Sequence, residues 1–198
     1  KAYPHQARLP HLAVQVNPAA FDPDALAPAA TRGDGGRVLG LVVGGNAGGF
    51  DYAADDWRRL AGLVTSIAQA APARFVISNS RRTPAEASDL IARLAAERPD
   101  VVRQFIDVRQ PSPAPLSALL AASEAVLATA DSSSMVSEAM WAGRPVLALM
   151  PAHARLEANE QSYRDWLAGL GWTAAAVLDT LDAEAALTMI EGLAPVGG

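Results

Sequence analysis

The 198-residue chain contains no cysteine, and its only lysine is the first residue, Lys1. Without thiols it forms neither disulfides nor thiolate zinc sites, and it has no thiol nucleophile. Without an internal lysine, a Walker-type phosphate loop and a Schiff-base lysine are both excluded. Arginine must therefore supply the permanent positive charge that meets any anionic ligand.

The low content of positive charge and the lack of long apolar runs exclude other classes of protein. The net charge of −5 argues against a general nucleic-acid binder, which needs a basic face. No apolar run approaches the ~20 residues of a membrane-spanning helix, and the start lacks a signal-peptide pattern. We therefore expect a cytoplasmic protein without a transmembrane segment, and peripheral membrane contact stays open. Because the chain begins with Lys1 rather than methionine, we expect a fragment or a processed product of a longer parent chain.

The first 36 residues differ in composition from the rest. A short apolar segment at 12–16 is followed by three scattered prolines and by the turn-forming run RGDGG at 32–36. We interpret residues 1–36 as an opening strand plus a connector, because proline and glycine interrupt regular structure there. Residues 37–198 are then expected to form one domain.

From residue 37 onward, apolar strands alternate with amphipathic helices. The predicted strands cover residues 37–43, 74–78, 101–108, 125–129 and 146–150. The predicted helices cover residues 53–71, 83–98, 115–122, 135–142, 157–169 and 182–191, and Thr83 with Glu86 has the spacing of a capping box. This alternation predicts the α/β class, as a doubly wound, Rossmann-like parallel sheet of five to six strands with helices on both faces.

Three loops at the carboxyl ends of these strands carry residues suited to an oxyanion. In a doubly wound sheet, ligands bind at that edge, near the point where the strand order reverses. Glycines let backbone N–H groups approach a phosphate, arginine matches its oxygens, and a helix start adds free N–H groups. The candidate residues are Gly44, Gly45, Asn46 and Ala47 in the first loop, Ser80, Arg81 and Arg82 in the second, and Asp131, Ser132, Ser133 and Ser134 in the third.

Each of these loops also has a purely structural explanation. The glycines suit a tight turn, the arginines suit a solvated edge, and one residue of the polar run 131–134 suits a helix cap. Capping leaves the other three polar residues without a role. If the helix extends back through the serines, Asp131, Ser134 and Glu138 share one face, and Glu138 could accept both hydroxyls of a ribose. The alternative for Glu138 is an ordinary surface position.

A resemblance to a known family is carried by LVVGGNAGG, by SRRTP and above all by LLAASEAVLATADSSSMVSEAMWAGRPV. These segments resemble the C-terminal half of the plant elongated-mitochondria (mitochondrial fission) family and its bacterial relatives. More distantly, they resemble the donor-binding domains of GT-B glycosyltransferases. The resemblance covers roughly residues 10–150 and is strongest at 119–149.

The resemblance implies half of a GT-B architecture that holds a nucleoside diphosphate sugar, with no cofactor and no metal. It matches Glu138 to the ribose-binding glutamate, and it matches Ser132, Ser133 and Ser134 to the turn that receives the diphosphate. The loop at 44–47 corresponds to the one that faces the donor phosphates and sugar. Arg81 corresponds to a basic contact near the base or the phosphates.

The chain also departs from this pattern. Only Asn159, Glu160 and Gln161 are loose equivalents of the usual sugar contacts, and GWTAAAV replaces an expected aromatic–histidine pair and an arginine near 164–175. In GT-B enzymes of the hexosyltransferase type, the acceptor and any catalytic base usually come from the N-terminal half. We therefore expect a donor-binding domain that works with an N-terminal Rossmann-like domain of the same parent chain and turns nothing over alone.

Three other functions stay open at this point. The first is a non-catalytic interaction domain of the mitochondrial-fission type, which the departures favour. The second is an NADP-binding oxidoreductase in which Arg81 and Arg82 meet the 2′-phosphate, although the glycine spacing differs from G-x-G-x-x-G. The third is a serine hydrolase, which the absence of a G-x-S-x-G motif disfavours.

Overall fold

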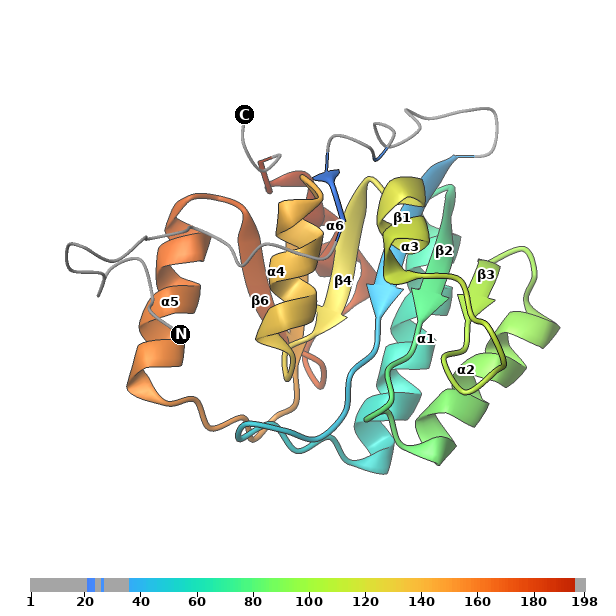
Figure 1. Ribbon diagram of the computed structural model, residues 1–198, viewed down its shortest axis with the longest axis horizontal. Helices are drawn as coiled ribbons and strands as arrows, with labels where there is room; N and C mark the ends of the chain where they lie inside the picture. Colours follow the sequence, from blue (N-terminus) through green and yellow to red (C-terminus); the bar gives the residue numbers. More distant parts are fainter. Residues whose placement is uncertain (1–20, 24–25, 27–35, 195–198) are drawn as a thin grey trace.

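Six parallel strands form one sheet in the computed structural model, which describes residues 21–23, 26 and 36–194 (Figure 1). The strands are β1 (Arg37–Val42), β2 (Ala73–Ser78), β3 (Val102–Ile106), β4 (Ala125–Thr129), β5 (Val146–Met150) and β6 (Thr173–Val177). Their order in the sheet is β3-β2-β1-β4-β5-β6. The predicted strand at 12–16 lies outside the described residues, so the division of the chain at residue 36 stays a prediction.

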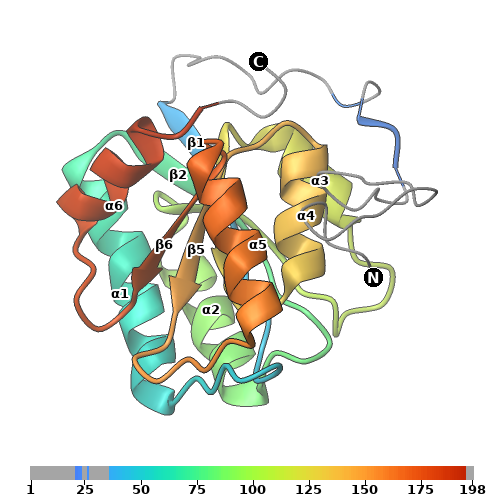
Figure 2. The ribbon, with the colours of Figure 1, turned by 90° about the vertical axis from the view of Figure 1, so that its left-hand side faces the viewer.

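Helices cover both faces of this sheet. They are α1 (Ala54–Ala70), α2 (Ala85–Glu97), α3 (Leu116–Ala122), α4 (Ser133–Trp141), α5 (Ala158–Gly169) and α6 (Ala183–Glu191). Residues of α1, α2 and α6 pack on one face, and residues of α3, α4 and α5 pack on the other (Figure 2). Among the described residues, no helix is both long and apolar enough to cross a bilayer. The doubly wound, Rossmann-like prediction is confirmed.

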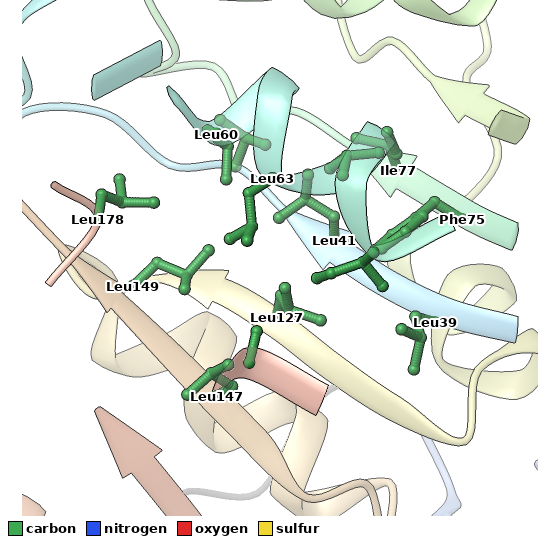
Figure 3. Close-up of a cluster of buried hydrophobic side chains, with 14 of the residues drawn as sticks. Leu39, Leu41, Leu60, Leu63, Phe75, Ile77, Leu127, Leu147, Leu149 and Leu178 are labelled. Atoms are coloured by element: carbon green, nitrogen blue, oxygen red, sulfur yellow. The ribbon is translucent and has the colours of Figure 1, made fainter. Parts of the chain in front are cut away.

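The two faces are built by alternate residues of the same strands, because successive side chains on a strand point to opposite sides. On one face, Leu39, Leu41 and Leu127 meet Leu60 and Leu63 of α1 (Figure 3). Their neighbours along the strands pack under α3, α4 and α5. Burying a leucine of this kind contributes about 1.5–3 kcal/mol, so the core fixes where each strand ends.

The sequence analysis missed β6. This strand pairs with β5 from Val146–Thr173 to Met150–Val177, although its centre, Ala174–Ala176, has little preference for strands. Pairing with a buried neighbour overrides that weak local preference. The third strand is also shorter than the predicted range of 101–108.

Two predicted helix starts are wrong. The helix predicted from Met135 begins at Ser133, because the Ser132 side chain accepts the N–H of Met135 and caps it there. The capping box at Thr83 does not form, since α2 begins at Ala85. The Thr83 hydroxyl instead donates to the carbonyl oxygen of Val43 and accepts the N–H of Ser80, both at 2.8 Å.

Candidate functional site

The strand order reverses between β1 and β4, and the loops that follow these two strands meet there. The N–H of Gly44 donates to Oγ1 of Thr129 at 2.6 Å. The N–H of Gly45 donates to Oδ2 of Asp131 at 3.0 Å. Parallel strands bring both loops to the same edge of the sheet, so residues about 85 positions apart in the chain close the crevice between them.

Asp131 is the centre of this contact. Its side chain has 0% exposure, and Arg82 from the loop after β2 binds its Oδ2 at 2.9 Å. A Cβ atom on Gly44 would lie 2.3 Å from both carboxylate oxygens, so only glycine leaves room for this carboxylate. Oδ1 has no hydrogen-bond partner among the described residues. Burial raises the pKa of the Asp131 carboxyl, and the Gly45 N–H, the Thr129 hydroxyl and the Arg82 guanidinium oppose that shift.

The start of α4 lies beside this carboxylate. Ser132 caps the helix, and its hydroxyl oxygen lies 3.1 Å from that of Ser134. No hydrogen bond of the described residues uses the N–H of Ser133 or Ser134, as is usual in the first turn of a helix. Two uncommitted donors and the positive end of the helix dipole therefore face the carboxyl edge of the sheet.

Helix α5 connects both loops through two charged residues. The Ser133 hydroxyl donates to Oε1 of Glu160 at 2.7 Å, and Nε of Arg164 donates to the same oxygen at 3.0 Å. The Arg164 guanidinium also donates to the carbonyl oxygen of Ala130 at 2.7 Å and lies 5.3 Å from the centre of the Phe50 ring. The sequence analysis missed Arg164, although the four-residue spacing from Glu160 was a signal for this ion pair.

A cavity of about 510 Å³ lies between these elements. It is lined by Gly48, Gly49, Phe50, Asp131, Ser133, Arg155, Glu157 and Glu160. The N–H of Arg155 donates to the carbonyl oxygen of Gly49 at 2.8 Å, while its exposed guanidinium has no ion pair among the described residues. The volume lies within the usual range of small-molecule sites. Arg155 was another residue that the sequence analysis missed.

The glycine-rich loop is shaped by its own internal contacts. The side chain of Asn46 donates to Asp51 at 2.7 Å and accepts the N–H of Tyr52 at 2.9 Å. Ala47 and Phe50 exchange backbone hydrogen bonds around a turn whose two glycines have φ values of +59° and +87°. The N–H groups of the two preceding glycines, expected to face a phosphate, are instead bound to Thr129 and Asp131 as described above.

Glu138 lies farther along α4 and is half-buried between Ser134 and Trp141. Desolvation raises the pKa of its carboxyl. Its side chain forms no hydrogen bond or ion pair with any described residue, and Glu138 does not line the 510 Å³ cavity. Because the helix begins at Ser133, Asp131 precedes it and does not share a helical face with Ser134 and Glu138.

The predicted site residues in the loop after β2 differ in what they contact. The Ser80 hydroxyl accepts the N–H of Arg82 at 3.2 Å, and Arg82 reaches Asp131. Arg81 is exposed and has no side-chain bond within the described part of the chain. The structure therefore brings Arg82, Asp131 and the first loop together and leaves Arg81 apart.

A sequence model of the mitochondrial fission ELM1 family matches residues 10–183. The chain belongs to this family. Among curated protein sequences, none matches the chain.

The fold of this mitochondrial fission ELM1 family member matches that of GT-B glycosyltransferases. MurG from Acinetobacter baumannii has a TM-score of 0.57 at 13% identity, over 97% of this chain and 52% of that one. The ADP-heptose LPS heptosyltransferase II of E. coli has a TM-score of 0.55 at 14% identity, over 94% of this chain and 55% of that one. The O-GlcNAc transferase of Thermobaculum terrenum has a TM-score of 0.52 at 20% identity, over 93% of this chain and 33% of that one. The chain thus spans about half the length of the first two transferases and about a third of the length of the third.

Proposed function

We propose that this chain is the nucleoside diphosphate sugar binding domain of a GT-B-like glycosyltransferase. The observation that carries the proposal is the start of α4, where the N–H groups of Ser133 and Ser134 are uncommitted and Ser133 lines the 510 Å³ cavity. Helix starts of this kind bind phosphate because several N–H groups and the helix dipole act together. Arg155, whose guanidinium has no ion pair among the described residues, adds positive charge to the lining of the same cavity.

Glu138 supplies the contact with the ribose in this proposal. It lies five positions after Ser133, and at 1.5 Å per residue its Cα lies about 7.5 Å farther along the axis. A nucleotide whose diphosphate rests on the helix start would place its ribose near that position. The carboxylate can accept from both ribose hydroxyls, and it has no competing partner among the described residues. No metal or cofactor is required for this mode of binding.

The proposal leaves the chemistry to a second domain. Since the chain spans about half of the heptosyltransferase and of MurG, we expect an N-terminal Rossmann-like domain of the same parent chain to bring the acceptor and any catalytic base. Alone, this chain is expected to bind a donor without transferring its sugar. The same proposal puts the domain in the cytoplasm, with peripheral membrane contact left open.

Isothermal titration of the chain with UDP, GDP and ADP, each with and without a linked sugar, tests this proposal. We expect one of the three series to bind, and Glu138→Ala to weaken that binding about 10- to 100-fold, which corresponds to the loss of ~1.5–3 kcal/mol. Glu184→Ala, at an exposed position on α6, is the matched control and should bind as the wild type does. If no nucleoside diphosphate binds the wild type at millimolar concentration, the proposal is wrong.

A second candidate is a non-catalytic interaction domain. It is favoured by the three acidic residues that line the cavity, Asp131, Glu157 and Glu160, whose charges disfavour a diphosphate unless their partners neutralise them. Two of the three have such partners, in Arg82 and Arg164. Tight assembly with the separate N-terminal half in the absence of nucleotide, together with no binding of nucleotide, would favour this second candidate.

A further inference from the structure

Helix α5 places a carboxylate beside the helix start that the proposed function assigns to a diphosphate. Glu160 lines the 510 Å³ cavity together with Ser133. Its Oε1 accepts a hydrogen bond from the Ser133 hydroxyl at 2.7 Å. A negative charge at this position repels a diphosphate, because like charges at close range weaken binding. The site therefore needs a group that offsets the charge of Glu160.

Arg164 is the residue that offsets this charge. It lies one turn farther along α5, and its Nε donates to the same Oε1 of Glu160 at 3.0 Å. The side chains of Arg164 and Glu160 are only 15% and 18% exposed, so water and salt screen this ion pair less than a surface pair. Arg164 does not line the 510 Å³ cavity, so a ligand there meets Glu160 and not the guanidinium.

The second contact of Arg164 fixes the backbone that leads into α4. Its guanidinium donates to the carbonyl oxygen of Ala130 at 2.7 Å, three residues before the helix begins at Ser133. The N–H of Ala130 donates to the hydroxyl oxygen of Tyr52 at 2.8 Å. Ala130 is thus bound on both sides, by α5 and by the segment that follows the first loop. A helix start that is already held in place loses less freedom when a ligand binds.

The ion pair also decides what the Ser133 side chain can offer a ligand. A serine hydroxyl has one proton to donate, and here Glu160 accepts it. The hydroxyl oxygen then has only lone pairs left, and phosphate oxygens are acceptors as well. A phosphate at the start of α4 therefore meets the N–H of Ser133 and not its hydroxyl proton.

Building on the proposed function, we propose that Arg164 is the positioning residue of the diphosphate site. It neutralises the Glu160 carboxylate, which holds the hydroxyl proton of Ser133, and it anchors the backbone that leads into α4. The site then recognises the diphosphate through backbone N–H groups. Its affinity depends on a guanidinium that the ligand does not contact.

The experiment is a double-mutant cycle on Glu160 and Arg164, with affinities measured by isothermal titration. The probes are whichever of UDP, GDP and ADP binds the wild type, and the corresponding uncharged nucleoside. Arg164→Gln leaves the carboxylate without its counter-charge, so the diphosphate should bind about tenfold or more weakly and the nucleoside within about twofold of the wild type. In Arg164→Gln/Glu160→Gln the repulsion is gone, so the diphosphate should recover most of the lost affinity.

Glu160→Gln alone keeps an oxygen that can accept from Ser133 and Arg164, and it removes the negative charge. This variant should bind the diphosphate about threefold more tightly than the wild type, so it tests the proposal even if Arg164→Gln fails to fold. Arg58→Gln, which breaks an exposed ion pair with Asp55 on α1, is the matched control and should leave both affinities unchanged.

Three outcomes contradict this role of Arg164. If Glu160→Gln weakens binding, the carboxylate itself contacts the ligand. If the double variant binds as weakly as Arg164→Gln, the guanidinium does not act through the charge of Glu160. If Arg164→Gln weakens the nucleoside as much as the diphosphate, the loss is structural. In each of these cases the wild type still binds a nucleoside diphosphate and the proposed function stands, whereas a wild type that binds none overturns both.

Discussion

The two loops that meet at the switch point use their backbone donors in opposite ways. After β1, the N–H groups of Gly44 and Gly45 are spent inside the protein, on Thr129 and Asp131. After β4, the N–H groups of Ser133 and the next residue have no partner in the described structure. Glycine in the first loop therefore reflects the close approach of the protein's own carboxylate, and the serines of the second loop carry the donors that remain for a ligand.

The largest expected effect comes from Gly44→Ala. The added Cβ would lie 2.3 Å from the buried Asp131 carboxylate, and that side chain cannot move without losing its bonds to the Gly45 N–H and Arg82. We expect the free energy of unfolding, measured with urea, to fall by about 3 kcal/mol. Gly62→Ala, on the exposed side of α1 with open space around it, is the control and should raise stability by about 0.5–1 kcal/mol. Equal stability of Gly44→Ala and the wild type would contradict the closed loop.

A smaller loss is expected for Thr83→Val. The Thr83 hydroxyl holds the last carbonyl before the first loop, that of Val43, and also accepts the Ser80 N–H. Valine keeps the shape but leaves both groups unpaired, which should cost about 2 kcal/mol in the free energy of unfolding. Thr83→Ser keeps the hydroxyl and should lose clearly less. If both variants unfold alike, the methyl group rather than the hydroxyl holds this loop.

The sequence was sufficient to predict the architecture, because buried parallel strands such as β4 are continuous apolar runs and the helices between them are amphipathic. It was insufficient for β6, whose three central alanines carry no strand signal. That strand depends on pairing with β5, which is a tertiary effect. The start of α4 was misplaced by two residues because any of the polar residues before Met135 could serve as the cap.

The candidate site was only partly predictable, for a related reason. The polar run from Asp131 to Ser134 and the glycines of the first loop are visible locally. Which donors face each other across the crevice depends on contacts about 85 residues apart in the chain. Arg155 and Arg164 come from the segment after β5, and only the folded sheet brings them to the loops.

The contrast between the loops is sharpened by comparing two arginines. Arg155 lines the cavity with an unpaired guanidinium, while Arg81, which the sequence favoured, makes no side-chain bond within the described residues. We expect Arg155→Gln to weaken nucleoside diphosphate binding about 3- to 10-fold, since an ion pair with phosphate at a partly exposed site is worth about 0.7–1.4 kcal/mol. Arg81→Gln should change binding less than Arg155→Gln does. Both variants are titrated at the same salt concentration. If Arg81→Gln weakens binding more than Arg155→Gln does, the sequence prediction that Arg81 contacts the ligand is favoured over the structural one.

The smallest expected change is in the stability of Glu138→Gln, and its sign separates binding from stability. Desolvation raises the pKa of Glu138 in the folded state, so the charged form is disfavoured there relative to the unfolded chain. The stability of the wild type therefore falls as pH rises from the ordinary pKa of a glutamate through the raised value, and glutamine removes that loss. At neutral pH the variant should have a slightly higher Tm than the wild type, and the difference should vanish as pH falls below the ordinary glutamate pKa.

The same variant should bind nucleoside diphosphates more weakly, because an amide cannot accept both ribose hydroxyls as a carboxylate does. If the half-buried charge of Glu138 serves a ligand, the variant should be more stable than the wild type and bind less tightly. A variant that loses stability at neutral pH would show instead that Glu138 has a structural role in α4.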